Sequence, residues 1–157
     1  MTSGESIARF LGLHRVGVVG VSRSGKEFGA VVFRDLAKRG YSVVPVNRQG
    51  GSIDGIPCVR SVNELAGSVD GIVVVVPPVE ALAVVEQAFS SGINDVWMQQ
   101  GAVSPAAIQF CRDHHMNEVH GECLLMFLAR HEFPHSWHRA IRKLTGRLPR
   151  VAVTGQQ

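Results

Sequence analysis

A glycine turn carrying two cations is the segment of this sequence best suited to chemistry. Residues 20–26 read GVSRSGK, close a Val-rich run at residues 15–21 and open a helical pattern at residues 26–39. The start of a helix presents free N–H groups and a positive dipole end, which attract phosphate. Arg23 and Lys26 add positive charge at the same place. The turn predicts a nucleotide pyrophosphate site, and a plain tight strand–helix turn is the alternative.

The turn departs from the dinucleotide fingerprint G-x-G-x-x-G, because Ser22 stands at the middle glycine. A side chain at that position pushes a ligand outward. An acid should hold the NAD ribose at the end of the second apolar run, but the residues there are Pro45-Val46-Asn47-Arg48. Arg48 could accommodate a 2′-phosphate, so an NADP-dependent oxidoreductase remains an alternative. G-x-x-x-x-G-K-[ST] is absent, and ordinary P-loop ATP or GTP binding is not expected.

The elements that must position this turn alternate along the chain. Short apolar runs predict strands at residues 15–21, 41–46, 71–76, 95–99 and 118–121, and periodic patterns predict helices at 26–39, 79–91 and 104–115. The alternation favours the α/β class: a single doubly wound, Rossmann-like domain with a five-stranded parallel sheet in the order 3-2-1-4-5. Ligands of such folds bind beyond the carboxyl ends of the strands, where the strand order reverses.

Length and composition bound the function classes. The 157 residues suit one domain and are too few for a complete two-domain oxidoreductase or ligase. The longest apolar run, residues 72–79, is far shorter than the ~18 residues of a membrane span, and the first residues show no signal-peptide pattern. The 3 cysteines have no CxxC spacing, which predicts reduced thiols in a cytoplasmic protein.

The positive charge is concentrated at one end. Residues 130–150 contain six Lys or Arg and one Glu. We therefore expect a domain at residues 1–129 and a basic extension at 130–157, with an extra C-terminal amphipathic helix at 136–144. That helix could pack its apolar face on the domain, clamp a polyanionic ligand, form a homodimer contact, or face nucleic acid or a membrane surface. Few aromatic residues accompany the charges, so nucleic acid is not an expected partner.

Short motifs in a particular order point to a family. They are VVGVSR at 18–23, FG at 28–29, GY at 40–41, PVN at 45–47, VPP at 76–78 and WMQQGA at 97–102. In this order and spacing, over about residues 15 to 126, the chain resembles the CoA-binding domain family. The members of this family that it resembles are stand-alone relatives of the N-terminal domain of the succinyl-CoA synthetase alpha subunit. The resemblance implies a small-molecule ligand, coenzyme A or an acyl-CoA, at the carboxyl end of the sheet.

The resemblance also implies where the ligand contacts the chain. The expected cofactor-binding residues are Gly20, Val21, Ser22, Arg23, Lys26, Pro45, Asn47, Arg48, Val76, Pro77, Pro78, Gln100 and Gly101. The first loop would wrap the phosphates, Asn47 would lie near the ribose, and the charge of Arg48 suits a 3′-phosphate. Relatives often have proline where Arg48 and Gln100 stand, and Arg or Asn where Glu122 stands.

Catalytic and metal-binding residues are not assigned. The synthetase uses a phosphohistidine from another domain, and His14, His114, His115 and His120 do not follow its motif. His131, His135 and His138 have helical spacing, but Pro134 interrupts that helix, so a metal site is not expected.

Cys123 follows the fifth predicted strand and could form a mixed disulfide with coenzyme A as a thiolate. A partly buried cysteine that shapes the pocket is the alternative. The sequence thus predicts a CoA-binding module without catalysis of its own. An NADP-dependent oxidoreductase using the same crevice and a redox-regulated protein capped by CoA on Cys123 are the alternatives.

Overall fold

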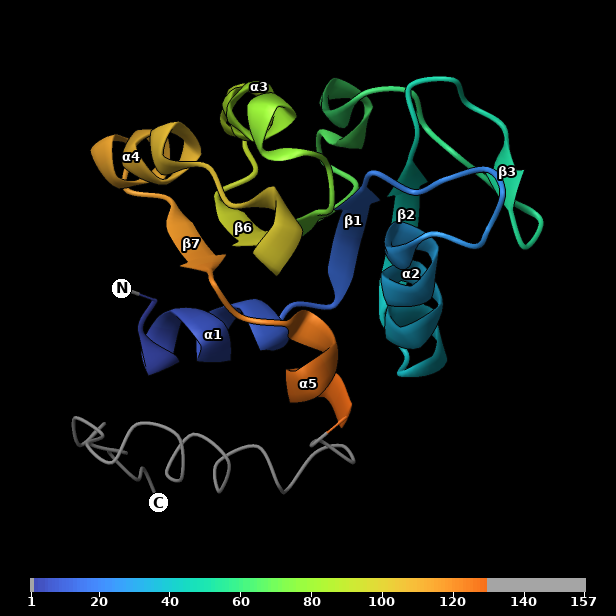
Figure 1. Cartoon of the computed structure of the whole chain (residues 1–157), viewed down its shortest axis with the longest axis horizontal. Helices are drawn as coiled ribbons and strands as arrows, with labels where there is room; N and C mark the ends of the chain where they lie inside the picture. Colours follow the sequence, from blue (N-terminus) through green and yellow to red (C-terminus); the bar gives the residue numbers. More distant parts are fainter. Residues whose placement is uncertain (1, 130–157) are drawn as a thin grey trace, which may run out of the picture.

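The computed structural model describes residues 2–129 (Figure 1). The expected basic extension at 130–157, its helix at 136–144 and the histidines at 131, 135 and 138 lie outside the described residues. No helix in the described range is long and apolar enough to cross a membrane.

A five-stranded parallel sheet forms the centre of the domain. Its strands are β1 (Arg15–Val19), β2 (Ser42–Val46), β5 (Gly71–Val74), β6 (Asp95–Met98) and β7 (Asn117–His120). The helices are α1 (Gly4–Leu11), α2 (Phe28–Lys38), α3 (Pro78–Ser90), α4 (Pro105–Asp113) and α5 (Leu124–Ala129), with short 3₁₀ turns η1 (Val62–Leu65) and η2 (Gln100–Ala102). A small hairpin, β3 (Ser52–Ile53) and β4 (Ile56–Pro57), follows β2. The predicted α/β class with a doubly wound parallel sheet is confirmed.

The strand order in space is β2-β1-β5-β6-β7. Taken in chain order, these five strands read 2-1-3-4-5. The expected 3-2-1-4-5 pattern is met if the segment at Val59, which forms a parallel bridge with Val46 outside β2, is counted as the third strand. The third predicted strand, at residues 71–76, therefore lies beside β1 and not outside β2. The order reverses between β1 and β5, so this is the point where a ligand is expected.

Two apolar cores lie on opposite faces of the sheet. Helices α1, α2 and α5 cover one face, and η1, α3 and α4 cover the other (Figure 1). Trp97 of β6 is fully buried on the first face, where its ring contacts Phe10 and Phe127 edge to face at centroid distances of 5.5 and 5.6 Å. Its indole N–H donates to the Glu122 carbonyl (3.1 Å), so the chain after β7 is held to the sheet.

The junction between the end of β1 and the start of α2 requires glycine at two points. Gly20 has a φ of +106°, and a Cβ there would lie 2.7 Å from the Val75 carbonyl oxygen. Gly29, in the first turn of α2, faces the Gly20 carbonyl so closely that a Cβ would overlap it. Helix α2 therefore packs backbone to backbone against the end of β1. This contact fixes the N-terminus of α2 at the carboxyl edge of the sheet.

We predict that Gly29→Ala destabilises the fold by about 1–3 kcal/mol, because the new methyl group must push α2 away from β1. Gly101→Ala is the matched control, since a Cβ at Gly101 meets nothing within 4 Å. Urea unfolding of both variants measures the difference. Equal stabilities would mean that α2 shifts at no cost and that the contact does not set its position.

Candidate functional site

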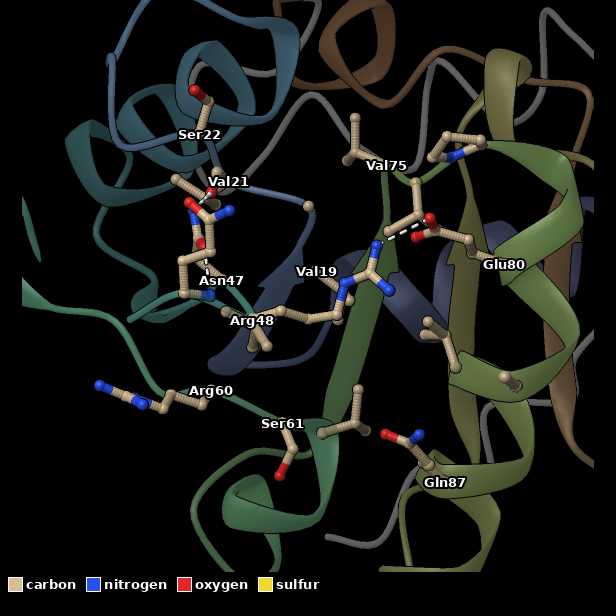
Figure 2. Close-up of a pocket in the computed structure, with 18 of the residues that line it drawn as sticks. Val19, Val21, Ser22, Asn47, Arg48, Arg60, Ser61, Val75, Glu80 and Gln87 are labelled. Atoms are coloured by element: carbon tan, nitrogen blue, oxygen red, sulfur yellow. Dashed lines mark hydrogen bonds and ion pairs between the residues drawn. The ribbon is translucent and has the colours of Figure 1, made fainter. Parts of the chain in front are cut away.

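A cavity of about 730 Å³ opens at the carboxyl ends of β1, β2 and β5. Its walls come from the turn after β1, the loop after β2, the start of η1, the segment after β5 and one face of α3 (Figure 2). Since the strand order reverses between β1 and β5, the cavity lies at the position predicted for a ligand of this fold. Its volume is within the range of small-molecule sites.

Seven of the predicted site residues line this cavity: Gly20, Val21, Ser22, Asn47, Arg48, Val76 and Pro77. Six do not: Arg23, Lys26, Pro45, Pro78, Gln100 and Gly101. Pro45 is buried within β2, opposite Val18 in register. Pro78 is the first residue of α3.

Asn47 ties two walls of the cavity together. Its side-chain N–H donates to the Val21 carbonyl (2.7 Å), and its side-chain oxygen accepts from the Gln49 N–H (2.8 Å). The Val46 carbonyl accepts from the N–H groups of both Gly20 and Val21, each at 3.2 Å. The end of β2 therefore holds the turn after β1 in place. The side chain of Asn47 is engaged in this support.

The loop between Val21 and α2 carries the predicted phosphate site. Helix α2 begins at Phe28, two residues later than predicted, and its N-cap Glu27 makes no side-chain capping hydrogen bond. The Ser22 hydroxyl accepts from the Ser24 N–H (3.2 Å), which shapes the loop locally. The guanidinium of Arg34 donates to the Gly25 carbonyl (2.6 Å) and pairs with Asp54 of the β3–β4 turn. Arg34 of α2 therefore holds the loop, and Asp54 of the hairpin fixes the Arg34 side chain.

Positive and negative side chains line the cavity in equal number. Arg48 and Arg60 line it together with Glu27 and Glu80. Arg48 donates to a carboxylate oxygen of Glu80 at 2.8 Å. Arg23 donates instead to the side-chain oxygen of Gln49 (2.6 Å) and lies against Gly51, next to the cavity but outside its lining.

One face of α3 was missed by sequence reasoning. Glu80, Ala83, Val84 and Gln87 recur at helical spacing and line the cavity. This spacing was readable in the sequence, but nothing local indicates that the face opens onto a cavity. Ser61 is the N-cap of η1 and forms a capping box with Glu64, whose carboxylate accepts from the Ser61 N–H (2.9 Å).

A second polar group lies farther along the carboxyl edge, at the ends of β6 and β7. Gln99 is only 4% exposed, and its side chain donates to the Cys123 sulfur (3.1 Å) and accepts from the Leu124 N–H (3.2 Å). Gln100 reaches the Gly121 carbonyl at 3.5 Å. Neither Cys123 nor Gln100 lines the cavity, so the predicted contacts of the reactive end of the ligand lie beyond it.

The other two cysteines are poor nucleophiles. Burial, aided by the negative charge of Glu118, raises the pKa of the Cys111 thiol to about 12. Burial also raises the pKa of Cys58. Both are therefore protonated near neutral pH. Among residues 2–129, no three His, Cys, Asp or Glu side chains are grouped to hold a metal ion.

Comparison with known proteins gives a family and a fold. A family described as "CoA binding domain" matches residues 14–129. A conserved hypothetical protein from Pyrococcus furiosus is similar at 34% identity and TM-score 0.68, over 72% of this chain and 97% of that one. A hypothetical protein from Pyrococcus horikoshii is similar at 23% identity and TM-score 0.73, over 80% of this chain and 89% of that one. A protein from Thermus thermophilus is similar at 23% identity and TM-score 0.71, over 90% of this chain and 99% of that one. No curated protein matches the chain.

We predict that Asn47→Ala lowers the free energy of unfolding by about 1–3 kcal/mol, because it leaves the Val21 carbonyl and the Gln49 N–H without their partner. The amides of residues 21–26 should also exchange with solvent faster. Asn94→Ala, at an exposed asparagine before β6, is the control. Hydrogen exchange by mass spectrometry measures the effect. Unchanged exchange in the loop would contradict a supporting role for Asn47.

Proposed function

We propose that this chain, which belongs to the CoA-binding domain family, binds coenzyme A or an acyl-CoA at the carboxyl end of its parallel sheet, without catalysis of its own. The observation that carries the proposal is the position of the cavity. All its lining residues fall within the matched range, and its walls include the segments that follow β1 and β5. Ligands of doubly wound sheets bind at this reversal of strand order.

The pyrophosphate is proposed to lie at the loop of residues 21–27. The N-terminus of α2 faces this loop without a side-chain cap, and helix N-termini favour negative charge. Arg23 and Lys26 are exposed beside it and can swing toward a bound phosphate. The Arg23 guanidinium already reaches Gln49 in the loop after β2, which supports a role at the rim of the site.

The adenosine is proposed to occupy the cavity itself. Val21, Val76 and Val84 supply apolar wall for the base, and Arg48 and Arg60 supply positive charge for a phosphate on the ribose. An apolar pocket with a few placed polar groups is typical of small-molecule sites. The pantetheine arm would then run past Val76 and Pro77 along the carboxyl edge, toward Gln100 and Gly101.

Substitution of a small residue in the cavity tests this placement. We expect Ala83→Trp to weaken coenzyme A binding at least about tenfold, because the indole fills space that the ligand needs. Ala106→Trp, on the exposed side of α4 and away from the cavity, is the matched control and should bind as the parent chain does. Isothermal titration with coenzyme A measures both.

Thermal shifts with coenzyme A and with NADP(H) separate the two nucleotide hypotheses. Stabilisation by coenzyme A that Ala83→Trp removes would support the proposal. Stabilisation by NADP(H), with none at millimolar coenzyme A, would overturn it in favour of the oxidoreductase alternative. Equal binding by both tryptophan variants would mean that the ligand lies elsewhere.

A further inference from the structure

An ion pair crosses the mouth of the cavity. Arg48 extends from the loop after β2 and meets Glu80 in the first turn of α3, with 2.8 Å between nitrogen and oxygen (Figure 2). The Arg48 side chain is 80% exposed and the Glu80 side chain is 33% exposed. The pair thus connects the two opposite walls between which the adenosine is proposed to lie.

A carboxylate at this position conflicts with a plain polyanion site. Glu80 brings a negative charge into the lining, and it occupies one donor of the arginine best placed to receive a ribose phosphate. The first turn of α3 favours an acid, because the N-terminus of a helix carries partial positive charge. Glu80 therefore lies within reach of Arg48, in the place that a ligand anion would take.

We propose that Glu80 is a specificity-determining residue, which holds Arg48 until a phosphate monoester on the ligand ribose displaces it. The inference rests on the proposed function, since it assumes that the cavity receives the adenosine of coenzyme A. Arg48 favours a ligand that carries the phosphate, and Glu80 lowers this preference because the phosphate must displace it and then lies beside its charge. A phosphate dianion with several acceptor oxygens competes well for a guanidinium, whereas a ribose hydroxyl does not.

The exchange is feasible because the existing pair is exposed. Ion pairs of this kind are weak, since water screens the charges and holding two long side chains costs entropy. Displacement by phosphate nevertheless leaves Glu80 close to a second anion, and this repulsion lowers the affinity for the phosphorylated ligand. A ligand without the phosphate leaves the Arg48–Glu80 pair intact. Glu80 therefore tunes the response to this one group.

The test compares coenzyme A with dephospho-coenzyme A, which lacks the 3′-phosphate, by isothermal titration. We expect Glu80→Gln to tighten coenzyme A binding about threefold to tenfold. Its affinity for dephospho-coenzyme A should change less than about twofold. Arg48→Gln should weaken coenzyme A binding, and in the double variant the gain from Glu80→Gln should disappear. Glu80→Asp, which retains the charge on a shorter side chain, should show a smaller gain.

Glu86→Gln is the matched control, because it removes the same charge from an exposed position of α3 outside the cavity. If it reproduces the gain, the effect is general electrostatics and the inference fails. If Glu80→Gln lowers the affinity for both ligands, Glu80 instead accepts hydrogen bonds from the ribose, and the inference also fails. Either of these two outcomes overturns the inference on Glu80 but leaves the proposed binding of coenzyme A standing. If neither the parent chain nor any variant binds either ligand, the proposed function falls, and the inference with it.

Discussion

The approach of α2 to the end of β1 is the contact on which the rest of the site depends. Gly29 and Gly20 bring two backbones together at a distance that no side chain permits. Helix α2 can therefore start directly at the carboxyl edge of the sheet, with residues 22–27 of the loop left to face solvent. The Val46 carbonyl and the Asn47 side chain then hold this turn from the β2 side. Without the close contact, the helix end, the loop and the cavity would lose their common position.

Much of this arrangement was predictable from local signals. Val-rich runs that end in glycine or proline identify parallel strands, and the order of short motifs indicated the family that the comparisons support. The strand order was less accessible, because residues 71–74 could pair outside β2 or beside β1, and only the packed sheet decides between them. Helix α2 begins at Phe28, with Glu27 as its N-cap, two residues after the predicted start at Lys26.

The individual site contacts were harder to foresee than the segments that carry them. The loop after β1 was identified, yet Arg23 turns to Gln49 and stays outside the cavity lining. Glu80 and Gln87 were not anticipated, since which face of α3 remains open depends on how η1 and the loop after β2 close the other sides. Local sequence fixes which residues share a helix face, but tertiary packing decides what that face meets.

The division of the core by the sheet bears on how such a domain can change over evolution. The cavity draws on α3 and the loops next to it, whereas Trp97, Phe10 and Phe127 belong to the layer of α1, α2 and α5 on the opposite face. Mutations that adjust ligand preference along α3 therefore leave that aromatic cluster untouched. Repacking of the aromatic layer can likewise raise or lower stability at a distance from the ligand. At these positions a mutation can therefore change ligand preference or stability one at a time, and Val21 is the residue that belongs both to the cavity lining and to the aromatic layer.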